Sequence, residues 1–252
     1  MSLAGQCGIV TGAGRGIGRE YARALAGEGA AVVIAEIDEA AGAESAAIIV
    51  SEGGDAIAVR TDVTDEASVA AMAASAASAF GGIDFLVNNA AIWGGLRPAT
   101  MTDVTLDEWT RVLTVNVTGV WLASRAVVGH MIERGGGAIV NQSSIGAYMG
   151  GPNVSHYATS KGAVNALTRA MARDLGDHQI RVNAIAPGQI ANEATLGLVS
   201  EQRLESMRTQ QCLKRAGDTA DLCGPLLFLL SDAAGFMTGQ VLVVDGGLVF
   251  IG

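Results

Sequence analysis

The sequence predicts an α/β fold in one domain, built on a parallel sheet that is flanked by helices. Short apolar segments alternate with helix-length segments along most of the chain, and strands separated in this way pair in parallel through right-handed crossovers. A glycine-rich turn joins the first apolar segment to the first helical one. The chain has 252 residues, of which 50% are hydrophobic and 16% charged. We therefore expect a large core in a single unit, because α/β domains often reach this size.

The first third of the chain carries four expected strands. The segment 7–10 reads as a buried strand and runs into the turn Thr11-Gly12-Ala13-Gly14-Arg15-Gly16-Ile17-Gly18. Ile17, Tyr21 and Leu25 then recur at helical spacing. The other strands expected here are 31–35, 56–59 and 84–87, and the helices between them are 39–52 and 66–80.

The rest of the chain continues the alternation. A long helical pattern covers 107–133, and the strands expected after it are 138–141, 180–185 and 241–244, with helices around 157–161 and 222–230. Residues 189–215 lack a strand pattern and are rich in polar, Met and Leu residues, so we expect a substrate lid there. The carboxyl ends of the parallel strands share one edge, and open α/β sheets bind ligands at that edge.

The glycine-rich turn is typical of a phosphate-binding loop. Gly12, Gly16 and Gly18 allow the backbone to approach a pyrophosphate, and the following helix offers N–H donors and the positive end of its dipole. A glycine motif alone is weak support for a dinucleotide site.

An acidic residue at the end of the second strand bears on the choice of dinucleotide. Glu36 can accept hydrogen bonds from an adenosine ribose hydroxyl and would repel a 2′-phosphate. The sequence therefore favours NAD over NADP. Arg15 is the opposing signal, because a cation in the loop could hold that phosphate; the other interpretation of Arg15 is a solvated loop residue.

Polar and small residues follow the third and fourth strands. Asp62 could bond the adenine ring, and it could also form the cap or turn that begins the next helix. Small residues follow Asn88 and Asn89, and they would let a cofactor lie close to the backbone. Asn116 falls in the middle of a long helical pattern, where asparagine is a mediocre helix former; it has either a specific task or a surface position.

The segment Tyr157-Ala158-Thr159-Ser160-Lys161 carries the strongest chemical signal. On a helix, Tyr157 and Lys161 lie on one face, so the phenol and the ammonium can point into the same pocket. A neighbouring cation favours phenolate and lowers the pKa of the tyrosine, which suits it to move a proton to and from an alcohol or ketone oxygen. Ser144 precedes this helix and follows an expected strand.

Charge and composition exclude several classes of function. The net charge is −9 and the pI about 4.8, so there is no basic stripe for nucleic acid or anionic membranes. We expect no signal peptide and no membrane-spanning helix, since the apolar runs are far shorter than about 18 residues. The three cysteines show no CxxC spacing, so we expect no disulfide, no metal site and a cytoplasmic location.

Several motifs together resemble the short-chain dehydrogenase/reductase family, in order and over nearly the whole chain. The motifs are Thr11-Gly12-x-x-x-Gly16-Ile17-Gly18, Asn88-Asn89-Ala90, Asn116, Ser144, Tyr157-x-x-x-Lys161, Pro187-Gly188 and Asp245-Gly246-Gly247. The resemblance implies a single doubly wound Rossmann-type domain over 1–252 with a seven-stranded parallel sheet, a nicotinamide cofactor and a homotetramer.

The resemblance also implies roles for individual residues. Tyr157 would be the general acid/base, Lys161 would lower its pKa and bind the nicotinamide ribose, Ser144 would hold the substrate oxygen, and Asn116 would support a proton relay through water. Together with the positions argued above, the expected cofactor-binding residues are Gly12, Arg15, Gly16, Ile17, Gly18, Glu36, Asp62, Val63, Asn89, Ala90, Ala91, Tyr157, Lys161, Pro187, Gly188, Ile190 and Asn192.

Two positions depart from the family pattern. Ala91 stands where the family often has glycine, which is tolerated if its φ is negative. Asn192 stands near the place where the family often has a threonine that bonds the nicotinamide carboxamide, and its amide can donate and accept in a similar way.

The substrate class follows from the expected pocket. The candidate pocket residues are Trp93, Leu96, Ile145, Met149, Leu196, Leu198 and Met207, a mostly apolar set that indicates a secondary alcohol or ketone with a hydrophobic body. The apolar segment 248–252 is expected at a subunit interface. The alternatives are an NADPH-dependent 3-oxoacyl-[acyl-carrier-protein] reductase, which Glu36 disfavours, and a dinucleotide-binding regulatory protein without turnover.

Overall fold

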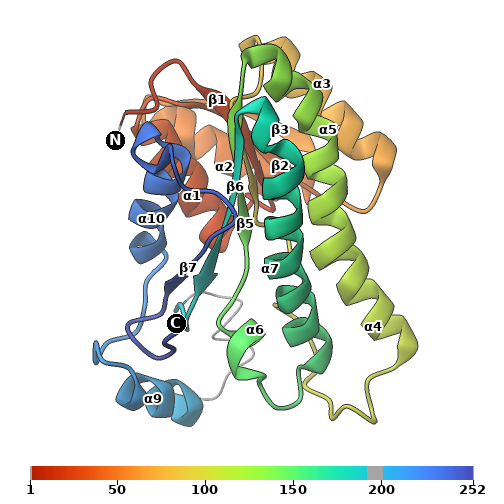
Figure 1. Ribbon diagram of the computed structural model, residues 1–252, viewed down its shortest axis with the longest axis vertical. Coiled ribbons are helices and arrows are strands. Elements are labelled where there is room, and N and C mark those ends of the chain that lie inside the picture. Colours follow the sequence, from red (N-terminus) through yellow and green to blue (C-terminus); the bar gives the residue numbers. More distant parts are fainter. Residues whose placement is uncertain (1, 192–200, 252) are drawn as a thin grey trace.

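A seven-stranded parallel sheet forms the centre of the protein, as the sequence predicts (Figure 1). The computed structural model describes residues 2–191 and 201–251, without the side chains of 201, 203, 204 and 207. The strands are β1 (Cys7–Thr11), β2 (Ala31–Glu36), β3 (Asp55–Arg60), β4 (Phe85–Asn88), β5 (Gly137–Gln142), β6 (Ile180–Pro187) and β7 (Val241–Val244). Their order is β3-β2-β1-β4-β5-β6-β7. The chain thus winds outward from β1 in one direction and from β4 in the other, which leaves a switch point between their carboxyl ends.

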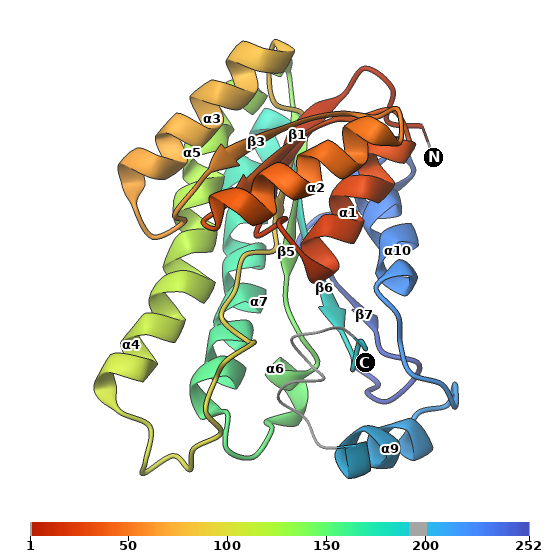
Figure 2. The same ribbon diagram turned by 180° about the vertical axis from the view of Figure 1, so that it is seen from behind.

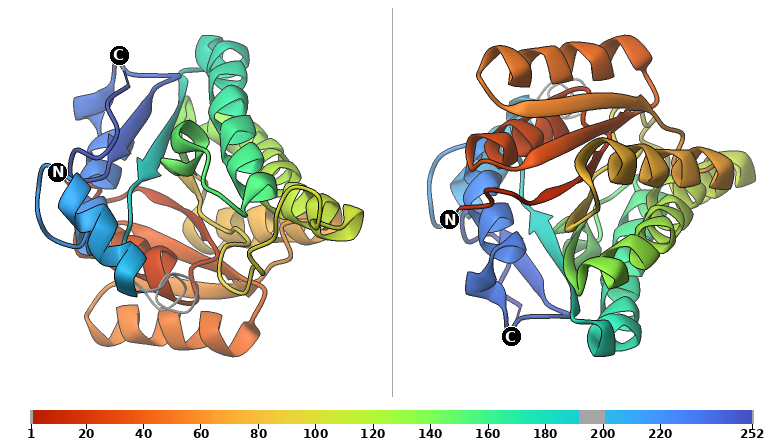
Figure 3. Two further views of the ribbon diagram at one scale, coloured as in Figure 1. Left: turned by 90° about the horizontal axis from the view of Figure 1, so that it is seen from below. Right: turned by 90° about the horizontal axis from the view of Figure 1, so that it is seen from above.

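Helices cover both faces of the sheet (Figures 2 and 3). One face carries α1 (Gly16–Gly27), α2 (Glu39–Ser51) and α10 (Ala220–Leu230), whose buried residues share one apolar cluster with the strands. The other face carries α3 (Glu66–Phe80), α5 (Gly119–Arg134) and α7 (Ser155–Leu175), which share a second cluster. The short α6 (Gly146–Met149) and the helix α9 (Glu201–Gln210) lie beyond the carboxyl edge. This two-layer cover explains why the central strands are apolar on both sides.

Local capping explains where several helices begin. The side chain of Asp38 accepts the Ala41 N–H at the start of α2, and Asp65 accepts the Ala67 N–H at the start of α3. Thr105 forms a capping box with Glu108 at the start of α4 (Leu106–Leu113). α1 differs from these three, because no side chain caps its first turn.

The predicted helix over 107–133 is interrupted. α4 passes into a π-helical turn at Thr114–Thr118 before α5 begins, and the expected mid-helix Asn116 lies in that turn. By length and composition alone, the continuous stretch Leu106–Arg134 could cross a membrane, with 44% of its most apolar window buried. Its buried residues pack against the sheet and α3, which is the position of a core helix.

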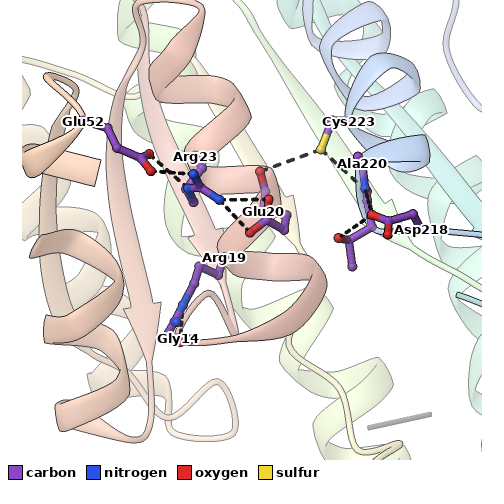
Figure 4. A network of polar contacts seen from close by, with 9 residues as sticks. Gly14, Arg19, Glu20, Arg23, Glu52, Asp218, Ala220 and Cys223 are labelled. Atoms are coloured by element: carbon purple, nitrogen blue, oxygen red, sulfur yellow. Dashed lines mark hydrogen bonds and ion pairs between the residues drawn. The ribbon is translucent and has the colours of Figure 1, made fainter. Parts of the chain in front are cut away.

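A polar network ties α1 to its neighbours on the sheet face (Figure 4). Arg23 pairs with Glu20 on α1 and with Glu52 just after α2. The Cys223 thiol on α10 donates to the Glu20 carbonyl at 3.8 Å. These contacts hold the helix that follows the glycine-rich turn in a fixed position.

Candidate active site

One cavity of about 930 Å³ lies at the carboxyl edge of the sheet. It runs from the glycine-rich turn at the end of β1 to the residues that follow β4, β5 and β6. Most of the sequence-predicted site residues line it: Gly12, Arg15, Gly16, Ile17, Gly18, Glu36, Asp62, Val63, Asn89, Ala90, Ala91, Ser144, Tyr157, Lys161, Pro187, Gly188 and Ile190. The structure therefore brings residues from seven segments of the chain to a single space.

The glycine-rich turn leaves room for an anion at the start of α1. Gly16 has φ +56°, a conformation that favours glycine, and nothing lies within 4 Å of the place where its Cβ would be. Gly18 is needed for a different reason, because a Cβ there would lie 2.2 Å from the Gly12 carbonyl oxygen. With no side-chain cap on α1, its first N–H groups remain available to a phosphate.

Arg19 holds the turn from behind (Figure 4). Its Nε donates to the Gly14 carbonyl at 3.0 Å, and its Nη2 pairs with Glu44 on α2 at 3.0 Å. The sequence pattern gave no reason to single out Arg19, because its position one turn into α1 is typical of a solvated face. Its role in holding the Gly14 carbonyl depends on the folded conformation of the turn and is therefore not apparent in the sequence.

Glu36 lies at the end of β2 beside the same turn. Its Oε2 accepts the Gly14 N–H at 3.0 Å, and its Oε1 accepts the N–H groups of Ile37 and Asp38 at 2.9 and 3.1 Å. Arg15 forms an ion pair with Asp38 across the exposed rim of the cavity. The guanidinium that could have held a 2′-phosphate is thus already engaged by a carboxylate.

Asp62 forms a turn rather than the helix cap. Its Oδ1 accepts the N–H and the hydroxyl of Thr64 at 2.9 and 2.7 Å, and these bonds hold the pKa of the carboxyl below its usual range. The cap of α3 is Asp65. Asp62 and Val63 both line the cavity, so the turn and a contact with a bound ligand are compatible.

Asn89 fastens the end of β4 to the end of β1. Its Nδ2 donates to the carbonyls of Thr11 and Gly12, each at 3.0 Å. The Thr11 hydroxyl accepts the N–H groups of Asn89 and Ala90, also at 3.0 Å. Ala91 does not have a positive φ, so the methyl group in place of a hydrogen is accommodated as expected.

Asn116 is buried, with 1% exposure, and its amide is fully used. Its Oδ1 accepts the Ile92 N–H at 2.7 Å, while its Nδ2 donates to the Ile92 carbonyl at 3.2 Å and to the Ser160 hydroxyl at 3.1 Å. Ser160 in turn donates to the Tyr157 carbonyl at 2.7 Å. The surface alternative for Asn116 is therefore wrong, and its side chain joins the loop after β4 to the helix that carries Tyr157. The proton relay stays a prediction.

Ser144, Tyr157 and Lys161 lie together on the wall of the cavity. The Ser144 hydroxyl accepts the Gly146 N–H at 3.0 Å and is hydrogen-bonded to the Tyr157 phenol. The Lys161 ammonium lies 5.6 Å from the centre of the Tyr157 ring and donates to the Gln142 carbonyl at 2.7 Å. The two hydroxyl groups thus point to one place where a substrate oxygen could bind.

The pKa values of this pair correct one expectation. Burial raises the pKa of Tyr157 to about 12, opposed by the hydrogen bond from Ser144, and burial lowers the pKa of Lys161 to about 8. The expected lowering of the Tyr157 pKa by Lys161 is outweighed in this arrangement, because the ammonium is turned toward Gln142 and both groups are desolvated.

These pKa shifts predict the pH dependence of an alcohol oxidation at this site. With a raised pKa, Tyr157 is protonated at neutral pH, so the fraction able to accept a proton grows by roughly tenfold per pH unit. We expect kcat/KM for oxidation to rise between pH 6 and pH 8, and kcat/KM for the reverse reduction to stay level over the same range. Initial rates measured in both directions would check this, and an oxidation rate that does not change with pH would contradict it.

The far side of the cavity is formed by the residues after β6. The Gly188 N–H donates to the Val244 carbonyl at 2.9 Å. Ile190 forms an isolated parallel bridge with Gly217 and is 5% exposed. Asn192 lies outside the described residues. The predicted lid over 189–215 contains the helix α9.

The apolar pocket candidates divide into three groups. Trp93, Ile145 and Met149 line the cavity, whereas Leu96 is buried elsewhere in the loop after β4. Leu196 and Leu198 lie outside the described residues, as does the side chain of Met207. The Trp93 ring packs on the Tyr157 ring with the centroids 4.4 Å apart and the planes tilted by 45°.

The cavity also includes residues that the sequence reasoning missed. They are Ala35, Ile37, Asp38, Thr61, Ile92, Gly94, Val115, Gln142, Ser143, Gly146, Gly151, Val154 and Gln189. Most of them adjoin a residue that was predicted, so a search of sequence neighbours would have found them. Asp38, Gln142, Gly151 and Val154 had no such signal, because none of them adjoins a predicted residue and only the folded chain brings them to the site.

The comparisons with known proteins agree with this geometry. A profile described as enoyl-(acyl carrier protein) reductase matches residues 12–249. An uncharacterized oxidoreductase of Mycobacterium tuberculosis (strain ATCC 25618 / H37Rv) is 49% identical over 241 residues, which covers 96% of each chain. The cis-4-hydroxycyclohexanecarboxylate dehydrogenase of Sinomonas cyclohexanicum is 42% identical over 247 residues, covering 98% of this chain and 97% of the relative.

A solved structure is similar to this chain in both fold and sequence. It is a 7α-hydroxysteroid dehydrogenase complexed with NADH and 7-oxo glycochenodeoxycholic acid, with a TM-score of 0.93 and 39% identity, covering 98% of this chain and 95% of that one. The match spans the sheet, the helices and the cavity together. The chain therefore belongs to the short-chain dehydrogenase/reductase family.

Proposed function

We propose that this oxidoreductase transfers a hydride between NAD(H) and a secondary alcohol or ketone with a hydrophobic body. The observation that carries the proposal is the shared cavity, in which an uncapped helix N-terminus and the Ser144–Tyr157–Lys161 cluster face one space. A phosphate-binding turn and a proton-transfer group are the two parts that such a reaction requires from the protein.

The residues present fit a dinucleotide. The space beside Gly16 and the free N–H groups of α1 would hold the pyrophosphate, Glu36 would face the adenosine ribose, and Lys161 would face the nicotinamide ribose. When bound, NAD would supply the hydride acceptor.

The chain's own part is to place the substrate oxygen and to move one proton. The Ser144 hydroxyl accepts the Gly146 N–H, and while Tyr157 is protonated the Ser144 proton can be donated to the substrate oxygen. Tyr157 takes the alcohol proton in the oxidative direction and returns it in the reductive direction. Trp93 packs on the Tyr157 ring and keeps water away from that face of the phenol.

Glu36 and Asp38 support NAD over NADP. Two carboxylates stand at the ribose end of the cavity, and Arg15 is paired with one of them, so a 2′-phosphate would meet like charge. We expect NADH to bind about 100-fold more tightly than NADPH, and Glu36→Ala to reduce that ratio. Fluorescence titration of the reduced cofactors would measure it.

The matched control for this experiment is Glu39→Ala. Glu39 lies on the first turn of α2, is exposed and is not a lining residue of the cavity, so its loss changes net charge without changing the ribose contact. Equal affinity for the two cofactors in the unsubstituted protein would remove the NAD preference from the proposal.

The apolar wall favours a hydrophobic substrate. Trp93, Ile145, Met149 and Val154 line the cavity near Tyr157, and two relatives are named for hydroxyl groups on rings, a steroid and a cyclohexane. A panel of secondary alcohols followed at 340 nm by NADH formation tests the function. Failure to oxidise any member with NAD or NADP, and to reduce the matching ketones, would overturn it.

The remaining expectations are proposals of the same kind. Phe250 is 82% exposed and Ile251 46%, and such apolar exposure in a single chain supports a subunit interface at the 248–252 segment. We retain the homotetramer on this basis and on the resemblance, and we retain the cytoplasmic location because all three cysteines are free thiols. Neither the acyl-carrier-protein reductase nor the regulatory protein without turnover is favoured by the relatives' names.

A further inference from the structure

Gly146 occupies the space next to both catalytic hydroxyl groups. It is the first residue of α6, and its N–H donates to the Ser144 hydroxyl at 3.0 Å. A Cβ at this position would lie 3.4 Å from the Ser144 Oγ and 3.6 Å from the Tyr157 Cε1. Because Gly146 does not have a positive φ, the backbone does not require glycine here. The lack of a side chain at position 146 therefore affects the space available in the cavity and not the conformation of α6.

A ring atom of Tyr157 beside this space indicates which part of a substrate the space would hold. Cε1 of Tyr157 is adjacent to the ring carbon that bears the hydroxyl, so a side chain at position 146 would stand beside the bound substrate oxygen. A secondary carbinol carbon carries two carbon arms in addition to its oxygen and its hydrogen. When the oxygen lies between the Ser144 and Tyr157 hydroxyls, the arm on the side of Gly146 must use the space that a side chain there would fill.

The neighbouring groups cannot easily move to enlarge the space. Trp93 packs on the Tyr157 ring at 4.4 Å, and the preceding residue, Ile92, is held through both its N–H and its carbonyl by Asn116. The Ser144 hydroxyl is held by the Gly146 N–H itself. The room for the second arm of the substrate is thus set mainly by residue 146.

From these contacts we infer that Gly146 determines substrate specificity by admitting an alcohol whose carbinol carbon has a large carbon arm on both sides, as in a ring. A side chain at this position would restrict that arm to a small group such as methyl. The inference rests on the proposed function. It narrows the substrate class to secondary alcohols that carry a large carbon group on each side of the carbinol carbon, cyclic alcohols among them.

The experiment compares two alcohols of equal carbon number. Cyclooctanol has two methylene arms on its carbinol carbon, whereas 2-octanol has one methyl arm, so the ratio of their kcat/KM values isolates the effect of the second arm. We expect Gly146→Val to lower the cyclooctanol/2-octanol ratio by roughly tenfold or more, mainly through KM, and Gly146→Ala to lower it by less. The matched control, Ala147→Val, adds bulk one residue further along α6, and Ala147 is not a lining residue of the cavity.

Two further measurements make each outcome decisive. Circular dichroism and NADH titration establish that the variants fold and bind the cofactor, so that a changed ratio reports the substrate site. An unchanged ratio in Gly146→Val, with turnover of both alcohols, overturns the inference and leaves the proposed function standing. If Ala147→Val shifts the ratio as much as Gly146→Val, the cause is distortion of α6 and the inference is also overturned. Oxidation of neither alcohol nor of any panel member by the unsubstituted protein overturns the proposed function itself.

Discussion

Replacing Tyr157 by phenylalanine is expected to lower kcat by roughly 10³-fold or more while leaving the fold intact. The substitution removes only the hydroxyl, and the ring would keep its packing against Trp93. What is lost is the group that receives the alcohol proton, together with the hydrogen bond between the phenol and Ser144. Steady-state kinetics at saturating alcohol and NAD would measure the effect, with NADH titration to show that the cofactor still binds.

Tyr148 provides the matched control for this substitution. Its hydroxyl is buried and has no hydrogen-bond partner among the described residues, and it does not line the cavity of the active site. Tyr148→Phe should therefore leave kcat within about twofold, since it removes no interaction with the reacting groups. Near-normal turnover by Tyr157→Phe would remove Tyr157 from the mechanism, whatever the control shows.

The second large effect is expected from Gly18→Ala in the glycine-rich turn. The added Cβ would lie 2.2 Å from the Gly12 carbonyl oxygen and 2.5 Å from the Asn89 Nδ2, distances that force the turn to move. The displaced backbone would no longer present its N–H groups to the pyrophosphate, so we expect NADH affinity to fall by about 100-fold or more. The strain should also cost about 1–3 kcal/mol of unfolding free energy.

Gly27→Ala separates these effects from the general consequences of replacing a helical glycine. Gly27 ends α1, and nothing lies within 4 Å of the place where its Cβ would be, so alanine there should be neutral or slightly stabilising. Thermal unfolding and cofactor titration of both variants would provide the comparison. Unchanged NADH affinity in Gly18→Ala would show that the turn does not hold the dinucleotide.

Local patterns were sufficient to predict most of the fold. The strand at 241–244 and the helix at 66–80 have the predicted bounds, and the other strands differ by a few residues at their ends. Their apolar runs and helical spacings are properties of short segments, so they are visible in the sequence. The π-helical turn at Thr114–Thr118 was not predicted, because its wider spacing has no signature in side-chain periodicity.

The pKa values of the site residues were harder to predict than the identity of these residues. The residues that would move a proton come from recognisable motifs, but the pKa of Tyr157 depends on burial by groups that are distant in sequence, among them Trp93. The hydrogen bond that turns Lys161 toward the Gln142 carbonyl likewise depends on how α7 packs against β5. Sequence motifs indicate which side chains come together in the active site. How far these side chains are desolvated depends on the three-dimensional packing around them.

The π-helical turn around Asn116 accommodates one extra residue between the helices α4 and α5. A π-helical turn winds more loosely than the about 100° per residue of a regular α-helix, so deleting one residue between Thr114 and Thr118 would return this segment to α-helical winding and leave α4 and α5 close to their present alignment. Such a deletion could restore ordinary winding and yet misalign the amide that grips the Ile92 backbone and the Ser160 hydroxyl. The helix would become more regular, but Asn116 would lose the hydrogen bonds that join the loop after β4 to the helix that carries Tyr157.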